Sequence, residues 1–383
     1  MEREAVLVAI DVGTSKVVAL IGEVTRDGAL NIIGKGTPPA SGLKKGVVIN
    51  IDQTTASIAA AIEGAERLSG YKLESAFVGV GGSHVESQNS RGAIAVSGPH
   101  KEVSREDVAR ATEVARAVQI PSNREVLHVL PRDFIVDGQE GVKDPLGMSA
   151  VRLEVETHIV HASATAVQNL SKCVQGAGVR IDELVAASLA SAEAVLSDTE
   201  KELGVAVADL GAGTTDLALF VDGSPFHTAV LPIGGINVTN DVAIGLKTGL
   251  DTAEALKISH GTCDRRMIDR DEMVQIGDRE AKLGEVSDII EARMREIFEK
   301  IGEHIASIGD EGMLPAGLVL TGGAAQLAGA AELGREVLQM PVRVAAPGGV
   351  GGLVDHLLAP GYSTSIGLLL WGARAVTEGD DTR

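Results

Sequence analysis

The sequence has few aromatic residues, few cysteines and a shortage of positive charge, and each shortage excludes a class of function. Aromatic residues make up only 2% of the 383 residues, so few side chains could stack on nucleobases. Acidic side chains outnumber basic ones by 53 to 34, and the formal net charge is −19. Such a charge is a poor match for a phosphate backbone, so we expect no nucleic-acid partner.

The sequence also lacks the features of a secreted or membrane-spanning protein. Its two cysteines, Cys173 and Cys263, are far apart and in no metal-ligand or redox spacing, so reduced thiols in a cytosolic protein are the simplest interpretation. No run of about 18 apolar residues occurs, and the first residues carry charges of both signs. We therefore expect a soluble chain without a signal peptide or a spanning helix.

What the sequence does contain is an alternation of Val- and Ile-rich runs with helical patterns, which is typical of an α/β architecture. Its length and its 44% hydrophobic residues suffice for two or more domains.

Residues 83–161 differ in composition and pattern from the rest of the chain. They combine a polar, glycine-bearing link (GGSHVESQNSRG), a helix with a capping box at Ser104 and Asp107, and short broken strands. We interpret them as a small inserted subdomain.

Two segments repeat one pattern, in which an apolar run, an aspartate, a glycine and hydroxyl residues precede a second apolar run. The first segment reads VAIDVGTSKVVALIGEV (8–24) and the second VADLGAGTTDLALF (207–220). Each predicts a tight hairpin between two strands. The repetition favours an internally duplicated α/β half over coincidence.

The two hairpins have the residue types of a phosphate site. Backbone N–H groups at such a turn can converge on phosphate oxygens, while hydroxyls and a lysine add donors and charge. Asp11 and Asp209 would repel phosphate unless a cation lay between, and Mg²⁺ bound mostly through water fits both. The predicted binding residues in the hairpins are Asp11, Gly13, Thr14, Ser15, Lys16, Asp209, Gly211, Gly213, Thr214, Thr215 and Asp216.

Three further features fit the rest of one nucleotide. Two glycine pairs, Gly234–Gly235 and Gly322–Gly323, each lie between a strand and a helix start, where a ligand can approach the backbone closely. The pair Gly322–Gly323 would admit a base or a ribose. Glu254 and Lys257 share one face of a helix, for which a surface salt bridge is the alternative. No Walker A sequence is present. These features add Gly234, Gly235, Glu254, Lys257, Gly322, Gly323 and Ala324 to the predicted site.

In this order, DVGTSK, DLGAGTTD, AEALK and VLTGGAAQL resemble the phosphate-1, phosphate-2, adenosine and second-glycine motifs of the actin, Hsp70 and sugar-kinase superfamily. Further segments, among them HTAVLPIGGINVTNDVAIGL and YSTSIGLLLWGA, are similar to the FtsA family of bacterial cell-division proteins over nearly the whole chain. The resemblance implies an actin-like (ribonuclease H-like) two-domain α/β fold with duplicated halves and an inserted SHS2-like subdomain, 1C. It divides the chain into 1A (1–82, 162–200 and 355–383), 1C (83–161), 2A (201–235 and 306–354) and 2B (236–305).

The resemblance also implies a function. ATP and Mg²⁺ would lie in the cleft between the halves, and the protein would polymerise into protofilaments. It would bind the tubulin-like FtsZ through subdomain 2B and link the FtsZ ring to the inner face of the cytoplasmic membrane. It would also recruit later divisome proteins, with subdomain 1C as one contact.

Two departures from the resemblance affect these expectations. Many superfamily ATPases carry a Glu or Gln before the first connecting helix, where it orients the attacking water. Here Ala186, Ala187 and Ser188 occupy that stretch and Glu193 lies further along, so we expect weak or absent hydrolysis, with ATP setting the angle between the halves.

Family members usually end in an amphipathic membrane helix, which is absent from this chain. Because the chain stops at GDDTR, either the natural chain is longer or a partner supplies the membrane link.

Two alternatives stay open from the sequence. A small-molecule kinase of the same fold would use Asp11 or Asp209 as the base for a substrate hydroxyl. A pilus-assembly scaffold similar to PilM would share the cleft and the insert.

His158 and His161 form an HxxH pattern, but residues three apart on a strand point to opposite faces, so we expect no shared metal.

Overall fold

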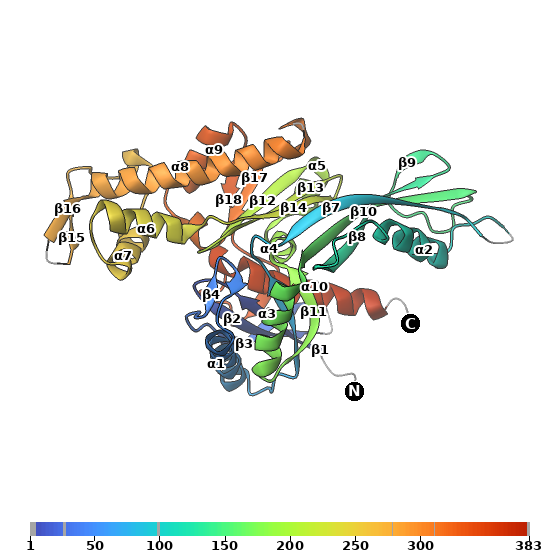
Figure 1. Ribbon diagram of the computed structural model, residues 1–383, viewed down its shortest axis with the longest axis horizontal. Coiled ribbons are helices and arrows are strands. Elements are labelled where there is room, and N and C mark those ends of the chain that lie inside the picture. Colours follow the sequence, from blue (N-terminus) through green and yellow to red (C-terminus); the bar gives the residue numbers. More distant parts are fainter. Residues whose placement is uncertain (1–4, 26–27, 98–99, 278, 310, 381–383) are drawn as a thin grey trace.

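The computed structural model describes residues 5–25, 28–97, 100–277, 279–309 and 311–380. Within these residues two α/β halves lie against each other, and a third unit projects beside the second half (Figure 1). The predicted α/β fold with two halves is confirmed. Of the acidic end GDDTR, residues 381–383 lie outside the described residues.

The first half is a sheet with helices packed around it. The sheet order is β11 (Arg180–Ala186), β6 (Ser75–Val80), β1 (Ala5–Val12), β2 (Val17–Val24), β3 (Leu30–Gly36) and β19 (Val350–Gly352). The helices are α1 (Ile51–Ser69), α3 (Ala164–Gly176), α4 (Ala187–Val195) and α10 (Ser363–Asp380), and a small hairpin joins β4 (Leu43–Lys44) to β5 (Val47–Val48). Local signals fix the helix ends: in α1 the Asn50 side chain accepts a hydrogen bond from the Gln53 N–H, and Gly70 ends the helix at φ 75°.

The second half repeats this plan. Its sheet order is β14 (Ser224–Leu231), β13 (Thr215–Val221), β12 (Val205–Leu210), β17 (Leu318–Thr321) and β18 (Val342–Val344). Its other elements are α5 (Asp198–Leu203), α6 (Gly235–Gly245), α7 (Leu250–His260), η1 (Arg265–Met267), β15 (Met273–Ile276), β16 (Arg279–Lys282), α8 (Leu283–Ile308), η2 (Glu311–Met313), η3 (Gly323–Gln326), α9 (Ala330–Leu338) and η4 (Pro360–Tyr362), the last of which leads back to α10.

The duplication is visible strand by strand. In each half an antiparallel hairpin is central, β1–β2 in the first half and β12–β13 in the second. A parallel strand lies beside the first strand of each hairpin, and an antiparallel strand lies beside the second. The order β11-β6-β1-β2-β3 therefore corresponds to β18-β17-β12-β13-β14. Both predicted hairpins thus occupy equivalent places in the two sheets.

The inserted unit has a sheet and a core of its own. Its strands lie in the order β7 (Glu86–Ala95), β10 (Arg152–Ser163), β8 (Arg124–Val136) and β9 (Gln139–Val142), and its helix is α2 (Arg105–Arg116). The capping box at Ser104 and Asp107 is present in both directions. A separate buried cluster, which includes Leu153, Val155 and Phe134, lies between this sheet and α2. The predicted polar link is wrong in part, because residues 86–95 form the edge strand β7.

The insert also contacts the second half, along β14 (Figure 1). The Ser87 hydroxyl donates to the Thr228 carbonyl at 2.8 Å, and Nε2 of the fully buried His158 lies 2.9 Å from Thr228 Oγ1. Burial, with neighbouring His227 and Arg132, lowers the pKa of His158 to about 3, so the ring is neutral. His161 has a different partner, since its Nδ1 accepts from Arg124 Nε at 3.0 Å.

Two large buried clusters fill the halves. The second half is built around α8, on which Val286, Ile290, Ile297 and Phe298 are fully buried. The cluster of the first half continues into the second, because α4 contacts α10 on one side and β12 and β13 on the other. Within the described residues, no helix combines the length and hydropathy needed to span a bilayer.

One predicted subdomain boundary is wrong. Residues 306–354 were assigned to the second half, but β19 pairs in parallel with β3 in the sheet of the first half. The chain therefore returns to the first half before Val350, and not at residue 355. Short strands of this kind carry too little apolar pattern to be placed from sequence.

Candidate functional site

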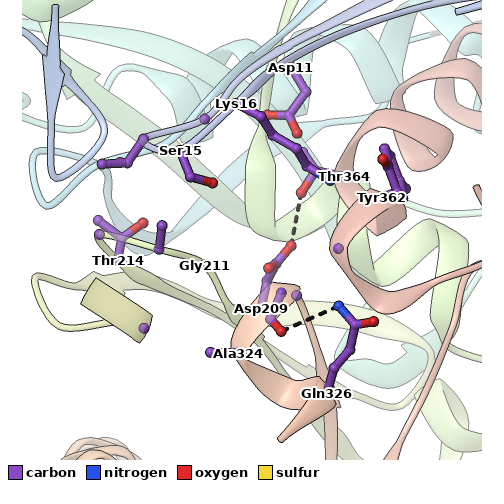
Figure 2. A pocket seen from close by; sticks show the side chains of 18 of the residues that line it. Asp11, Ser15, Lys16, Asp209, Gly211, Thr214, Ala324, Gln326, Tyr362 and Thr364 are labelled. Atoms are coloured by element: carbon purple, nitrogen blue, oxygen red, sulfur yellow. Dashed lines mark hydrogen bonds between the residues drawn. The ribbon is translucent and has the colours of Figure 1, made fainter. Parts of the chain in front are cut away.

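The two central hairpins open onto one cavity between the halves. Its volume is about 740 Å³, and its lining comes from β1, the β1–β2 turn, β12, β13, α7, η3, η4 and the start of α10. Figure 2 shows Asp11, Ser15 and Lys16 on one side of it and Asp209, Gly211 and Thr214 on the other. The sequence motifs thus converge in space.

The hairpins approach each other directly. A β-carbon placed on Gly213 would lie 2.8 Å from Thr14 Oγ1, so only a glycine fits at this closest point. Thr14 Oγ1 in turn accepts a hydrogen bond from the Gly46 N–H at 3.1 Å, which attaches the β4–β5 turn to the first hairpin. The turns of the β1–β2 and β12–β13 hairpins therefore face the same cavity.

Most of the predicted site residues line this cavity, and two do not. Those that line it are Asp11, Gly13, Thr14, Ser15, Lys16, Asp209, Gly211, Gly213, Thr214, Asp216, Gly235, Glu254, Lys257, Gly322, Gly323 and Ala324. Thr215 lies behind the wall, because strand alternation turns it away from Thr214 and Asp216, and its hydroxyl donates to the Ile233 carbonyl at 2.8 Å. Gly234 packs against the second hairpin, where a β-carbon would meet the Gly211 carbonyl oxygen at 2.7 Å.

Several lining residues were missed by the motif analysis. They come from the β4–β5 turn, the end of β6, α7, η3 and the stretch from 356 into the start of α10, and include Gly46, Gly79, Gly81, Ile258, Gln326, His356, Gly361, Tyr362 and Thr364. The quoted segment YSTSIGLLLWGA contains Tyr362 and Thr364, but nothing in its pattern distinguishes a cavity wall from an ordinary helix start. Glycines at strand ends were the available signal, since they allow close backbone approach.

The carboxylate of Asp209 is held by two hydroxyls of the first half. Ser191 on α4 and Thr364 at the start of α10 both donate to Asp209 Oδ2. The bond from Thr364 is 2.8 Å long and is drawn in Figure 2. Burial raises the pKa of Asp209, and these two hydrogen bonds oppose that rise. Asp209 therefore connects the second hairpin to both helices that join the halves.

Two further carboxyls lie in the same cavity wall. Burial, followed by the proximity of Asp209, raises the pKa of Asp11 to about 7, and Lys16 acts in the opposite direction. The same two causes raise the pKa of Asp216 to about 7. Asp216 Oδ1 is buried without a hydrogen-bond partner. Such an orphaned oxygen beside two other acids is the environment that a hydrated divalent cation would satisfy.

The three acids are not arranged as direct metal ligands. Among the residues that the structure describes, no group of three His, Cys, Asp or Glu side chains is close enough to hold an ion. A cation that keeps most of its water, as Mg²⁺ commonly does, is compatible with this spacing. The residues present therefore fit Mg²⁺ coordinated mostly through water.

The raised carboxyl pKa values predict a pH-dependent effect of Asp216→Asn. Between about pH 4 and pH 7 the folded chain holds protons on Asp11 and Asp216 that the unfolded chain releases, so these groups lower stability as pH rises. We expect the stability of Asp216→Asn relative to the parent chain, measured by urea unfolding without Mg²⁺, to increase from about pH 5 to about pH 8.

Asp264→Asn is the matched control for this experiment. Hydrogen bonds from Arg266 lower the pKa of Asp264 to about 2, so this acid is ionised in both states over the same range. Its effect on unfolding should be constant with pH. A constant difference for Asp216→Asn as well would contradict the assignment of a strained carboxyl cluster.

The Glu254–Lys257 pair is a salt bridge and also part of the wall. Lys257 Nζ lies 2.7 Å from Glu254 Oε2 and donates to Thr239 Oγ1 at 2.9 Å and to the Gly235 carbonyl at 3.2 Å. Lys257 is only 8% exposed. The pair therefore ties α7 to the glycine-led start of α6 at the cavity edge, with the lysine buried and the Glu254 side chain 44% exposed.

Glu193 does not face the cavity. It forms an ion pair with Lys201 at 3.4 Å and another with Arg374. Ala187 lines the cavity at the start of the same helix. In the described part of α4, no acidic side chain lines the cavity between the hairpins.

Solved structures define the class of this protein. The chain is similar to a protein of a "PilM-PilN type IV pilus biogenesis complex" (TM-score 0.70, 17% identity, covering 97% of this chain and 99% of that one). It is also similar to MreB5 of Spiroplasma citri bound to ADP (TM-score 0.60, 13% identity, 100% and 99% covered). Two duplicated halves around a shared cleft thus define the fold as actin-like.

Sequence comparisons give the particular family. A profile described as "SHS2 domain inserted in FTSA" matches residues 82–161, and one described as "Cell division protein FtsA" matches residues 206–367. Cell division protein FtsA of Pseudomonas aeruginosa is 44% identical over 97% of this chain and 90% of its own length. The chain belongs to the FtsA family of cell-division proteins, which decides against the kinase and PilM alternatives.

Proposed function

We propose that the cavity binds ATP with Mg²⁺ and that the bound nucleotide controls assembly of the chain. The observation that carries this proposal is the direct approach of the two hairpins, with Gly213 against Thr14, across a space lined by Lys16 and three carboxyls. Asp11 and Asp209, with Asp216 beside them, would hold Mg²⁺ through water, and the metal would supply the positive charge that phosphate needs. The proposal that the cavity binds a nucleotide is supported by the similar fold of MreB5 of Spiroplasma citri, which is bound to ADP.

The 740 Å³ volume is large enough for a complete nucleotide. The backbone of both hairpins would take the phosphates. Glu254, Lys257 and Ile258 of α7 line the same cavity as Gly322, Gly323 and Ala324, and these residues would receive the ribose and the base. The subdomain ranges given above remain our proposal, with the return to the first half moved before Val350.

In the cell we propose an adaptor role at the division site. The chain would polymerise, bind FtsZ through subdomain 2B and link the FtsZ ring to the cytoplasmic membrane, with other divisome proteins contacting subdomain 1C. Subdomain 2B exposes apolar side chains suited to burial against a protein partner, namely Ile244, Leu250, Met267 and Met273. Slow hydrolysis is part of the proposal, because alanine stands where an acid would orient water.

Sedimentation tests this function. With Mg²⁺ and ATP the chain should pellet as filaments, release little phosphate, and co-pellet with FtsZ polymers. The same measurement on lipid vesicles tests the membrane link. Loss of FtsZ co-pelleting in Ile244→Glu, but not in the first-half control Leu68→Glu, would assign the contact to 2B. Both Ile244 and Leu68 are exposed in the chain, at 75% and 52%. Absence of any ATP-dependent assembly would overturn the proposal.

A further inference from the structure

The ammonium of Lys16 lies on the face of an aromatic ring. Lys16 Nζ is 3.4 Å from the centroid of Tyr362, and both side chains line the cavity (Figure 2). Burial lowers the pKa of Lys16, while Asp11 and Asp209 oppose that shift through charge alone. Among the described residues, the ammonium makes no ion pair with either carboxylate. Its nearest partner is therefore a π face, which attracts a cation without neutralising it.

The ring is fixed by a segment that belongs to both halves. The Pro360 carbonyl accepts from the Gly322 N–H at 3.1 Å and from the Thr321 hydroxyl at 3.2 Å, both in the second half. Two residues after Tyr362, Thr364 donates to Asp209. Lys16 itself comes from the first hairpin. Tyr362 thus aligns the lysine of the β1–β2 hairpin against residues 360–364, which are hydrogen-bonded to Asp209 of the β12–β13 hairpin.

We propose that Tyr362 is a positioning residue that holds Lys16 charged and unpaired for a ligand phosphate, an inference that rests on the proposed function. A carboxylate partner in the same place would have to be displaced before phosphate could bind, whereas the ring releases the ammonium at small cost. The ring face that Lys16 covers is not available for stacking on the base.

This role predicts an effect that depends on the phosphates and on Lys16. Tyr362→Leu should weaken binding of ATP with Mg²⁺ by about tenfold. Binding of adenosine, which has no phosphate, should change by less than about twofold. Tyr362→Phe keeps the π face and should restore most of the affinity. In a Lys16→Met background, Tyr362→Leu should add nothing, because its effect acts through the lysine.

Isothermal titration of ATP, ADP and adenosine on the full chain, with Tyr362→Met as a second variant if Tyr362→Leu folds poorly, tests these expectations. Equal losses for ATP and adenosine, an undiminished effect in Lys16→Met, or a Tyr362→Phe variant as weak as Tyr362→Leu would each overturn the proposal. If the parent chain itself bound no ATP, the proposed function would fail instead. The two failures are therefore distinguishable.

Discussion

Replacing Gly367 by alanine is expected to lower the free energy of unfolding by about 3 kcal/mol. Gly367 lies in α10 where that helix crosses α4, and a β-carbon there would be 1.7 Å from the Ala190 carbonyl oxygen and 2.4 Å from its carbonyl carbon. Backbone atoms cannot rotate away as a side chain can, so the two helices must separate. Urea unfolding followed by circular dichroism measures the loss.

The same separation would disturb the cleft. Ser191 on α4 and Thr364 on α10 both donate to Asp209, so moving the helices apart withdraws the hydroxyls that hold this carboxylate. Gly302→Ala in α8 is the matched control, because its β-carbon would meet only the flexible end of Leu338, at 3.0 Å. Alanine should be tolerated there, or improve the helix. Equal stabilities of the two variants would contradict the packing described for α4 and α10.

The second large effect is expected from Asp209→Asn, which should act in opposite directions on stability and on binding. Three carboxyls with raised pKa values share the cavity wall, so removing one charge should stabilise the chain in the absence of ligand at neutral pH. Binding of ATP with Mg²⁺ should fall by about a hundredfold, because the metal loses a charged partner. Thermal unfolding and titration calorimetry on the same preparation measure both effects.

Glu193→Gln provides the control for that substitution. Glu193 lies on α4, as Ser191 does, but its partners Lys201 and Arg374 are outside the cavity wall. The change from acid to amide should therefore leave ATP affinity within about twofold of the parent. If Asp209→Asn destabilised the chain and left binding intact, Asp209 would be a structural acid and the metal proposal would be wrong.

The hairpins were predictable because their chemistry is local. Residues 8–24 and 207–220 each carry the strands, the turn glycine, the acid and the hydroxyls, and the repetition of the pattern indicated equivalent places in a duplicated fold. The capping box of α2 was predictable for the same reason. In each case neighbouring residues determine the structure.

Contacts between distant segments were not predictable. Nothing near Tyr362 in sequence indicates that its ring would lie on Lys16, and nothing near Ser191 indicates Asp209. Strand β7 was missed because its polar residues pair on one side with β10 and contact β14, so it lacks apolar alternation. Thr215 matched the motif, but one step along the strand turned it to the opposite face.

The central claim is that the two hairpins clamp one phosphate chain between them. Hydrogen–deuterium exchange of the full chain, with and without Mg²⁺ and ATP, measures this directly at residues 11–16 and 209–216. We predict that both segments become protected together, at one ATP concentration, and that removal of Mg²⁺ abolishes protection of both. Protection of one hairpin alone, or of neither while ATP remains bound, would contradict the account.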